Sequence, residues 1–457
     1  MRQYALSVQS GAVMIILGKN IHITSFRVIS FGFLFVILAG SFLLMMPFAS
    51  KAPGSASFID SLFTATSAVC VTGLVVHDTA TYWTSFGHAV ILCLIQIGGM
   101  GVITVAVALA MISGRKIGLM QRNTMKEAIA APHVGGIVRL TKFIVKITIF
   151  IELTGALIMS PVFIRDFGIG RGIWFSFFHS ISAFCNAGFD LLGIRGPYSS
   201  LTSYVTQPVI NLVIMGLIIA GGFGFLTWED VLLHGIHFRK YRLQSKMILT
   251  ITPFLIILPA LFFYFYEYNN VQGPARFWLS IFQSVTPRTA GFNTADLASL
   301  SEPSVAIITI LMLIGGSPGS TAGGMKNTTV FFLILSSLSV FRRKNDTVCF
   351  KRRISDDTLK NASTILMMYL VLFLTGGLMI SCLEKLPIHV CLFETASAIG
   401  TVGLTLGITP TLGSVSKLIL ICLMFFGRVG GLTLIFATSA NPRHNLSRFP
   451  QEDVTVG

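Results

Sequence analysis

Eight long apolar runs dominate this chain of 457 residues and constrain its fold more than any other feature. Each run is long enough to cross a lipid bilayer, for which a helix needs about 20 mostly apolar residues. Charged residues make up only 11% of the chain, against about 25% in a typical soluble domain, which is too few to cover a water-facing surface. We therefore predict an all-α polytopic membrane protein. Its predicted spans are residues 30–49, 86–113, 143–164, 205–233, 246–266, 304–340, 361–383 and 414–439.

A shorter, semi-apolar segment lies between the two spans of each successive pair. A helix of about 12 residues would be about 18 Å long, too short for a hydrocarbon core of about 30 Å, so each segment should enter the membrane and turn back. The repeating unit is a span, a re-entrant pore loop and a second span, and four tandem units should surround one axis in a pseudo-fourfold arrangement. The predicted organisation is an N-terminal segment at 1–29, repeats at 30–113, 143–233, 246–340 and 361–440, connecting loops at 114–142, 234–245 and 341–360, and a C-terminal tail at 441–457.

The basic residues predict the orientation of the chain. There are 33 lysines and arginines against 18 acidic residues, and most of them fall in the terminal segments and in the loops between repeats. Cytoplasmic loops carry an excess of Lys and Arg, so we expect both termini to be cytoplasmic and the re-entrant segments to enter from outside. The basic loops could instead bind nucleic acid, but they are short and tethered to the bilayer, and we expect no nucleic-acid partner.

The four re-entrant segments share a signature that ends in glycine. In three of them a phenylalanine lies ten residues before that glycine, as Phe63 does before Gly73. Non-helical backbone at membrane depth must be buried in protein or line a water-filled cavity. Glycine permits φ > 0 and can aim successive carbonyls to one side, and rings of carbonyls can replace the hydration shell of a cation. The alternative is that these glycines only mark tight extracellular turns. The candidate ion-binding backbone comprises Val71, Thr72, Gly73, Asn186, Ala187, Gly188, Thr289, Ala290, Gly291, Thr401, Val402 and Gly403.

The sixth span contains five glycines and a proline near its centre, and these residues disfavour a continuous helix. We expect a polar loop at 315–324 that can occlude a pathway beneath the glycine signatures, although a plain kinked helix is the alternative. Lys326 follows the break and could anchor it. Arg428 lies about 17 Å down the eighth span, and an ionisable residue inside a span is a functional candidate by default; its alternative role is a buried ion pair that orients helices. The candidate gate comprises Gly315, Gly316, Ser317, Gly319, Ser320, Thr321, Gly323, Gly324, Lys326 and Arg428.

These features resemble the Trk/Ktr/HKT superfamily of potassium transporters, and most closely its Ktr-type membrane subunits. The resemblance covers residues 25–457 and rests on the four signatures, the glycine-rich stretch at 315–324, and two further motifs. One motif is Gln96-Ile97-Gly98-Gly99-Met100-Gly101, and the other is Gly427-Arg428-Val429-Gly430. One departure is Cys70, where relatives commonly carry threonine.

The resemblance implies a K⁺ filter at Gly73, Gly188, Gly291 and Gly403, with the 315–324 loop and Arg428 as the gate. It further implies a homodimer in the plasma membrane, carried on a cytosolic nucleotide-binding regulatory ring. The nucleotide is then expected only on that partner, and this chain needs no covalent cofactor. Na⁺ stimulation, known for some relatives, stays open.

The main rival interpretation is a secondary cation transporter, a Na⁺/K⁺ or H⁺/K⁺ symporter with broken helices at the midplane. The four repeats share one orientation, which favours a rotational pore over inverted halves. The sequence has no nucleophile–base pair, P-loop or dinucleotide fingerprint, so we predict that the protein is not an enzyme. We expect Arg288, beside the third signature, to point behind the filter, with Asp60 and Glu394 as possible charge partners.

Overall fold

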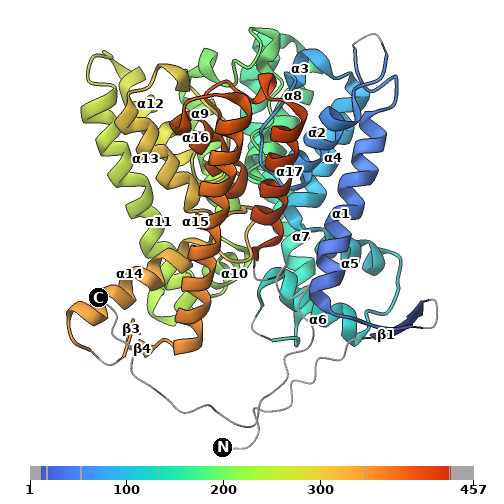
Figure 1. Ribbon diagram of the computed structural model, residues 1–457, viewed down its shortest axis with the longest axis vertical. Coiled ribbons are helices and arrows are strands. Elements are labelled where there is room, and N and C mark those ends of the chain that lie inside the picture. The colour runs from blue at the N-terminus through green and yellow to red at the C-terminus, as the bar shows by residue number, and fades with distance from the viewer. Residues whose placement is uncertain are drawn as a thin grey trace, which may run out of the picture.

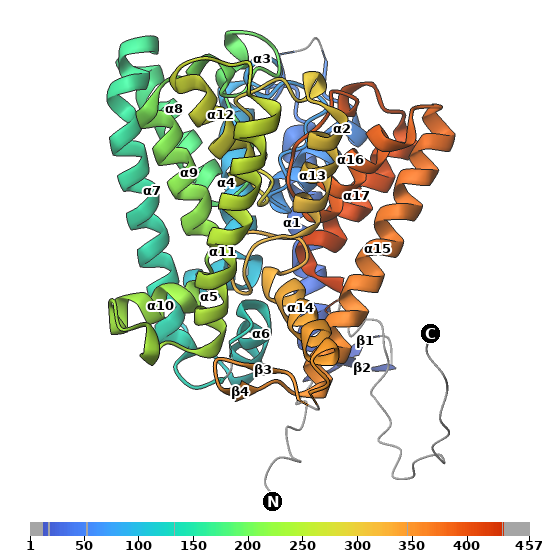
Figure 2. The ribbon, with the colours of Figure 1, turned by 90° about the vertical axis from the view of Figure 1, so that its left-hand side faces the viewer.

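The computed structural model describes residues 12–16, 19–51, 54–131, 133–344, 346–431 and 433. Long helices run side by side along the long axis of the molecule in both ribbon views (Figures 1 and 2). Within the described residues, four helices are long and apolar enough to cross a membrane, and two bent helix pairs meet the same criterion when each pair is taken together. The predicted C-terminal tail at 441–457 lies outside the described residues.

The helices form four successive groups, each with a long first helix, a short re-entrant helix and a second helix. The first group contains α1 (Ser25–Leu44), α2 (Phe58–Val69), α3 (Thr79–Tyr82), α4 (Ser85–Met100) and α5 (Val102–Ile112). The second contains α7 (Ile137–Phe167), α8 (Ile169–Phe184), η1 (Leu192–Ile194), η2 (Thr202–Tyr204), α9 (Pro208–Gly222) and α10 (Phe225–His234). The third contains α11 (Leu243–Phe262), η4 (Phe263–Glu267), α12 (Pro274–Val285), η5 (Leu297–Ser299), α13 (Glu302–Leu313) and α14 (Asn327–Phe341). The fourth contains α15 (Asp356–Glu384), α16 (Ile388–Gly400), η6 (Thr409–Thr411) and α17 (Ser414–Val429).

The re-entrant helices α2, α8, α12 and α16 occupy the centre of the molecule, and the predicted arrangement of four pore-loop repeats is confirmed. Every side chain of α2 from Phe63 to Val69 is buried, and every residue of α16 from Phe393 to Gly400 is buried as well. The surrounding long helices expose apolar side chains outward, such as Phe35 on α1 and Phe150 on α7. An apolar outer surface is the form expected in lipid, where every backbone polar group must be satisfied within the protein.

The second helix is interrupted in the first three repeats, whereas the sequence led us to expect a break only in the third. The expectation of continuous helices at 86–113 and 205–233 is wrong, because α4 and α5 meet at 97° and α9 and α10 meet at 99°. Gly101 and Gly224 form the two corners with φ near +86°. Gly430 ends α17 with the same conformation, at φ +88°, and the end of the predicted span at 414–439 lies outside the described residues. Glycine permits these turns because it has no Cβ.

Short elements cover the end of the molecule to which the basic loops belong (Figures 1 and 2). The predicted loop at 114–142 contains a helix, α6 (Leu119–Ile129), whose Met125 and Ile129 are buried. The η3 turn (Phe238–Lys240) joins α10 to α11. Two antiparallel hairpins complete this end. In the first, β1 (Ala12–Ile16) pairs with β2 (Lys19–Ile23), with Ala12 opposite Ile23 and Ile16 opposite Lys19. In the second, β3 (Val348–Cys349) pairs with β4 (Arg352–Arg353).

At the opposite end, acidic side chains fasten the helices of a repeat to each other. In the fourth repeat, Glu384 at the end of α15 accepts hydrogen bonds from the amide of Gly413 at 2.8 Å and the hydroxyl of Ser416 at 2.5 Å. Glu267 accepts from Ser304 in the third repeat at 2.5 Å, and Asp166 accepts from Tyr204 in the second at 2.7 Å. In these three repeats the end of the first helix is thereby tied to the start of the second helix or to the turn just before it.

The ring of repeats is closed by an ion pair between the first and the last. Lys417 of α17 lies 2.8 Å from Asp60 in the first turn of α2. His77 also contacts Asp60, at 3.3 Å. Both side chains of the Asp60–Lys417 pair are largely shielded from solvent, so this pair is worth more than a fully exposed one.

Candidate selectivity filter and gate

Each re-entrant helix is followed by a short segment in which positive and negative φ angles alternate. The signature glycines have positive φ, and so does the residue two positions earlier, while the residue between them does not. Such alternation turns successive carbonyls toward the same side of the strand. A positive φ is unfavourable for β-branched residues, so three of these positions hold strain that the surrounding structure must maintain. The angles are +52° at Val71, +58° at Asn186, +65° at Thr289 and +51° at Thr401, and +90°, +70°, +80° and +93° at Gly73, Gly188, Gly291 and Gly403.

The four glycines form a closed ring. A methyl group added to any one of them would contact the carbonyl oxygen of the residue that precedes the glycine of the next repeat. The fourth repeat makes this contact with the first, so the ring has no gap, and all twelve candidate filter residues lie together around one axis. The distance from the added Cβ to the carbonyl oxygen is 2.5 Å from Gly73 to Ala187, 2.7 Å from Gly188 to Ala290 and 2.5 Å from Gly291 to Val402, and Gly403 makes the same contact with Thr72.

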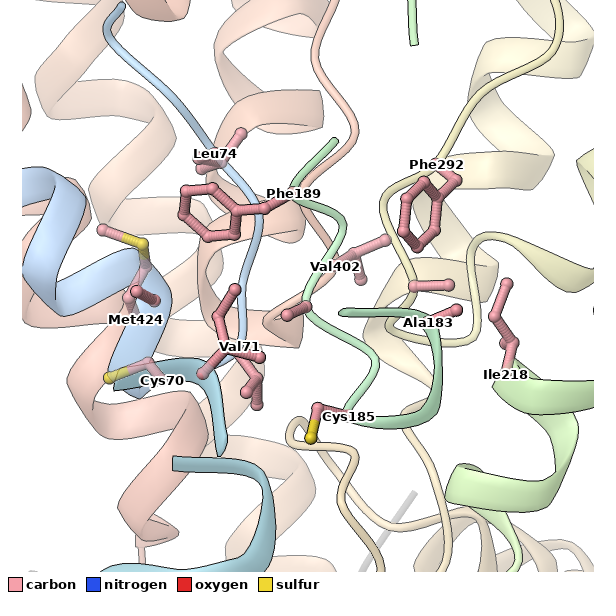
Figure 3. Close-up of a cluster of buried hydrophobic side chains, with 14 of the residues drawn as sticks. Cys70, Val71, Leu74, Ala183, Cys185, Phe189, Ile218, Phe292, Val402 and Met424 are labelled. Carbon is pink, nitrogen blue, oxygen red and sulfur yellow. The ribbon is translucent and has the colours of Figure 1, made fainter. Parts of the chain in front are cut away.

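Figure 3 shows how the side chains around this ring are arranged. Leu74, Phe189 and Phe292, which directly follow their glycines, lie toward one end of the close-up, and Cys70 and Cys185 lie toward the other. All five side chains are at most 1% exposed. The segments that end in the signature glycines are therefore surrounded by a packed layer of apolar side chains.

Hydroxyl side chains at the end of each re-entrant helix hold the filter segments, and the sequence reasoning assigned them no role. Ser67 accepts a hydrogen bond from the amide of Gly73 at 3.1 Å, and Ser397 does the same for Gly403 at 3.0 Å. In the other two repeats Ser182 donates to the carbonyl of Phe189, and Thr286 to that of Phe292. The signal was present, because a hydroxyl residue stands five or six positions before every signature glycine.

Glycines in three of the second helices permit a close approach to the re-entrant helices. A methyl group on Gly98 would overlap the carbonyl oxygen of Val69 at the end of α2. In the same way, a methyl group on Gly221 would overlap the carbonyl oxygen of Phe184 at the end of α8, and one on Gly427 would overlap the carbonyl oxygen of Ile399 in α16. Gly98 and Gly427 belong to the two motifs that carry the family resemblance, and their role is to let these helices cross at backbone distance.

Arg428 is bound to backbone carbonyls from two other repeats. Its guanidinium donates to the carbonyl of Thr321 in the 315–324 loop, and to those of Gly98 and Gly99 at the end of α4, the last at 3.1 Å. No carboxylate lies within ion-pair distance of Arg428 in the described part of the chain. Arg428 is half-buried, and its guanidinium binds only backbone carbonyls within the described residues.

The 315–324 loop is folded against the inner end of the filter and connects α13 to α14. Backbone hydrogen bonds fix both ends of the loop. The amide of Gly315 donates to the carbonyl of Met325 at 2.7 Å, and the amide of Gly324 donates to the carbonyl of Gly427 at 3.1 Å. A methyl group on Gly323 would contact the hydroxyl of Thr401, which brings the loop directly beneath the fourth filter segment.

Further contacts fix the middle of the loop. Ser317 donates to the carbonyl of Gly222 at 3.0 Å and accepts from Asn327 at 3.0 Å. Gly316 accepts from the amide of Asn327 at 3.0 Å, and Gly319 lies against the last carbonyl of α6. The hydroxyl of Ser320 lies 3.5 Å from the carbonyl of Ala322, and Lys326 donates to the same carbonyl at 2.9 Å. The ten candidate gate residues are therefore in one connected region.

Two cavities lie on either side of this assembly. The cavity on the side away from the basic loops, called the outer cavity below, has a volume of about 210 Å³ and is lined by all four signature glycines together with Asp78, Asp190 and Asp296. The inner one, of about 250 Å³, is lined by Arg428, Lys326, the 315–324 loop and Glu127 of α6. A cation that moved between them would meet acidic groups first, then carbonyl oxygens, and then the loop and Arg428.

The charge partners suggested for Arg288 are wrong. Asp60 pairs with Lys417 and His77, and Glu394 accepts a hydrogen bond from Thr409. Arg288 is buried, and no carboxylate pairs with it within the described residues. Sequence spacing placed these residues at a similar depth but could not tell which side of each re-entrant helix they occupy.

Comparison with known proteins identifies the relatives of this arrangement. The family model described as "Cation transport protein", TrkH, matches residues 23–448. The chain is 40% identical to the potassium/sodium uptake protein NtpJ of Enterococcus hirae, over 94% of this chain and 97% of that protein. It is also 40% identical to the Ktr system potassium uptake protein B of Bacillus subtilis, over 96% and 98% of the two chains.

A solved structure supports the same assignment at the level of the fold. The crystal structure of the potassium transporter TrkH from Vibrio parahaemolyticus superposes with a TM-score of 0.73 at 20% identity, covering 91% of this chain and 84% of that one. The family is one of membrane ion transporters, so the protein is a transporter and not an enzyme. With the family model spanning most of the sequence and two relatives matching nearly end to end, the chain belongs to the TrkH/Ktr family of cation transport proteins.

Proposed function

We propose that this protein takes up K⁺ through a channel-like pore whose selectivity filter is the ring of four glycine segments. The closed ring carries the proposal, because in it each repeat aligns its backbone against the next and carbonyl oxygens can surround one cation. Relatives are named for potassium and for potassium/sodium uptake, and glycine at all four positions favours K⁺ in our assignment. The driving force is the membrane potential, worth about 2.3 kcal/mol per charge per 100 mV.

The gate in this proposal is the 315–324 loop together with Arg428. The loop is bonded beneath the filter, and the guanidinium places a fixed positive charge in the path of a cation. The hydrogen bond from Arg428 to Thr321 would break when the loop moves aside, which would open the way to the inner cavity. Deletion of residues 315–324 should therefore raise the basal flux.

Assembly and location follow the family. The protein would lie in the plasma membrane as a homodimer with both termini in the cytoplasm, and a cytosolic nucleotide-binding ring would regulate it. The basic end that carries α6 and the β3–β4 hairpin offers a face for such a ring. No cofactor is required on this chain, and any nucleotide would be held by the regulatory partner.

The competing proposal is a symporter that couples K⁺ to Na⁺ or H⁺. Uptake of ⁸⁶Rb⁺ or K⁺ into proteoliposomes separates the two, with the membrane potential set by a chemical gradient and with no gradient of Na⁺ or H⁺. A channel-like pore should accumulate the tracer under these conditions, and K⁺ should compete with it. Uptake that appears only when a Na⁺ or H⁺ gradient is imposed would favour the symporter.

A further inference from the structure

Asn186 joins the filter segments of the second and third repeats. Its side-chain amide donates to the carbonyl of Arg288 at 3.2 Å and to the hydroxyl of Thr289 at 3.3 Å. Asn186 is fully buried and has φ +58°, a conformation that asparagine tolerates better than most residues. The corresponding residues of the first and fourth repeats, Val71 and Thr401, make no side-chain hydrogen bond of this kind, so the bond is particular to one side of the ring.

Thr321 of the 315–324 loop binds the same asparagine from below. Its hydroxyl shares its one proton between the carbonyl of Phe184, at 2.9 Å, and the side-chain oxygen of Asn186, at 3.3 Å. Its amide donates to the carbonyl of Gly221 at 3.2 Å, and its own carbonyl accepts from Arg428. Thr321 therefore connects the loop, the second filter segment and the gate arginine.

The direction of these bonds matters because an asparagine amide has two unlike ends. With its oxygen turned toward the Thr321 hydroxyl, its nitrogen faces the carbonyl of Arg288, which is an acceptor. If the amide turned over, two oxygens would face each other at that point, and a buried carbonyl would lose its donor, which is costly. The carbonyl of Arg288 thus fixes the orientation in which Asn186 ties the third filter segment to the second, and the Thr321 hydroxyl holds the oxygen end of the same amide in place.

We propose that Asn186 is a selectivity-positioning residue that Thr321 holds in place, so that the position of the gating loop alters the geometry of the filter. This inference rests on the proposed function, in which the glycine ring selects K⁺ and the loop gates it. It goes beyond that function because a simple gate would change only how much ion passes. Here the loop also changes which ion the filter prefers.

Thr321→Val tests the inference, because valine keeps the shape of threonine and removes the hydroxyl. The measurement is the ratio of K⁺ to Na⁺ competition against ⁸⁶Rb⁺ uptake, made on the full-length protein in proteoliposomes. We expect the ratio to fall by about two- to tenfold, the range that one neutral hydrogen bond supports, and Thr321→Ser to restore it. Thr148→Val is the matched control, since it removes a buried hydroxyl of α7 that has no hydrogen-bond partner within the described residues and should leave the ratio unaltered.

A double-mutant cycle separates the proposed coupling from two independent effects. Asn186→Gly keeps the positive φ available and removes the whole amide, so it should also lower the ratio. If Thr321 acts through Asn186, then Thr321→Val should cause little further change in the Asn186→Gly background. Effects on the ratio that multiply in the double variant would overturn the inference.

The outcomes also distinguish this inference from the proposed function. A parent protein that does not discriminate K⁺ from Na⁺ would refute the filter assignment itself. A parent that prefers K⁺, combined with a Thr321→Val variant in which the maximal rate changes and the ratio does not, would leave the filter and gate intact and refute the coupling through Asn186.

Discussion

Arg428 of the last repeat donates a hydrogen bond to the carbonyl of Thr321 in the third repeat, and this bond joins the two elements of the candidate gate. The same guanidinium reaches Gly98 and Gly99 of the first repeat. One side chain therefore holds three repeats together just beneath the filter. Movement of the loop must break at least one of these contacts, which makes the arginine a point where opening can be controlled.

Removal of this charge should open the pathway. In Arg428→Gln the fixed positive charge is lost and the contacts to the loop are weakened, so basal ⁸⁶Rb⁺ uptake without any regulatory partner should rise severalfold. Arg428→Lys keeps the charge and should give a smaller increase, because a lysine cannot bind several carbonyls with the forked geometry of arginine. Equal or lower flux in the glutamine variant would show that Arg428 only orients helices.

The close helix crossing at Gly221 should be sensitive to a single methyl group. Gly221→Ala places a Cβ against the carbonyl of Phe184, and overpacking of this kind costs about 1–3 kcal/mol. Gly216 lies on the same helix and provides the control, because a Cβ added there has nothing within 4 Å. Gly216→Ala should therefore be neutral or slightly stabilising. The unfolding temperatures of both variants are measured on the purified protein in detergent. Equal unfolding temperatures would contradict the close approach of the two helices at Gly221.

The outer cavity should give uptake a pH dependence near neutrality. Burial, with a smaller contribution from the charge of Asp78, raises the pKa of Asp190 to about 7. The carboxyl is therefore mostly neutral at pH 6 and negatively charged at pH 8, when it attracts cations to the mouth. The KM for K⁺ should be lower at pH 8 than at pH 6. In Asp190→Asn the KM should be the same at both pH values and should equal the higher value that the parent has at pH 6. A pH response that persists in the asparagine variant would assign it to another group.

A side chain added to one glycine of the candidate filter should impair the preference for K⁺ over Na⁺. Gly291→Ser places a Cβ 2.5 Å from the carbonyl of Val402 at a residue with φ +80°, so the third and fourth segments must shift apart. The preference for K⁺ over Na⁺ should fall by about tenfold or more, because a shift of this size costs more than about 1.4 kcal/mol. Gly216→Ser is the matched control away from the axis, and an unchanged preference in Gly291→Ser would exclude this glycine from the filter.

The sequence was most informative where the four repeats could be compared with one another. The aligned signatures predicted Gly73, Gly188, Gly291 and Gly403 as one set, and they lie in one ring because similar units meet at a common axis. The hydroxyl residues such as Ser67 were visible in the same alignment, but their partners are backbone atoms, which carry no sequence signal.

The breaks in the second helices were harder to predict for a physical reason. The helix after Gly101 is apolar except for Thr104, so composition continues smoothly across a 97° bend. Only the recurrence of a glycine three residues after Gly98, Gly221 and Gly427 marks the corner. The absence of a carboxylate partner for Arg288 within the described residues could not be predicted, because a charge beside a re-entrant helix can face either side and only packing decides which.

The most direct test of the central claim is the ion preference of the unaltered protein. The purified chain is reconstituted in liposomes, ⁸⁶Rb⁺ uptake is driven by a membrane potential, and competition by K⁺ and by Na⁺ is measured over the same concentration range. Four glycine segments in a closed ring predict that K⁺ competes at far lower concentration than Na⁺. Equal competition by the two ions would contradict the assignment of this ring as a potassium filter.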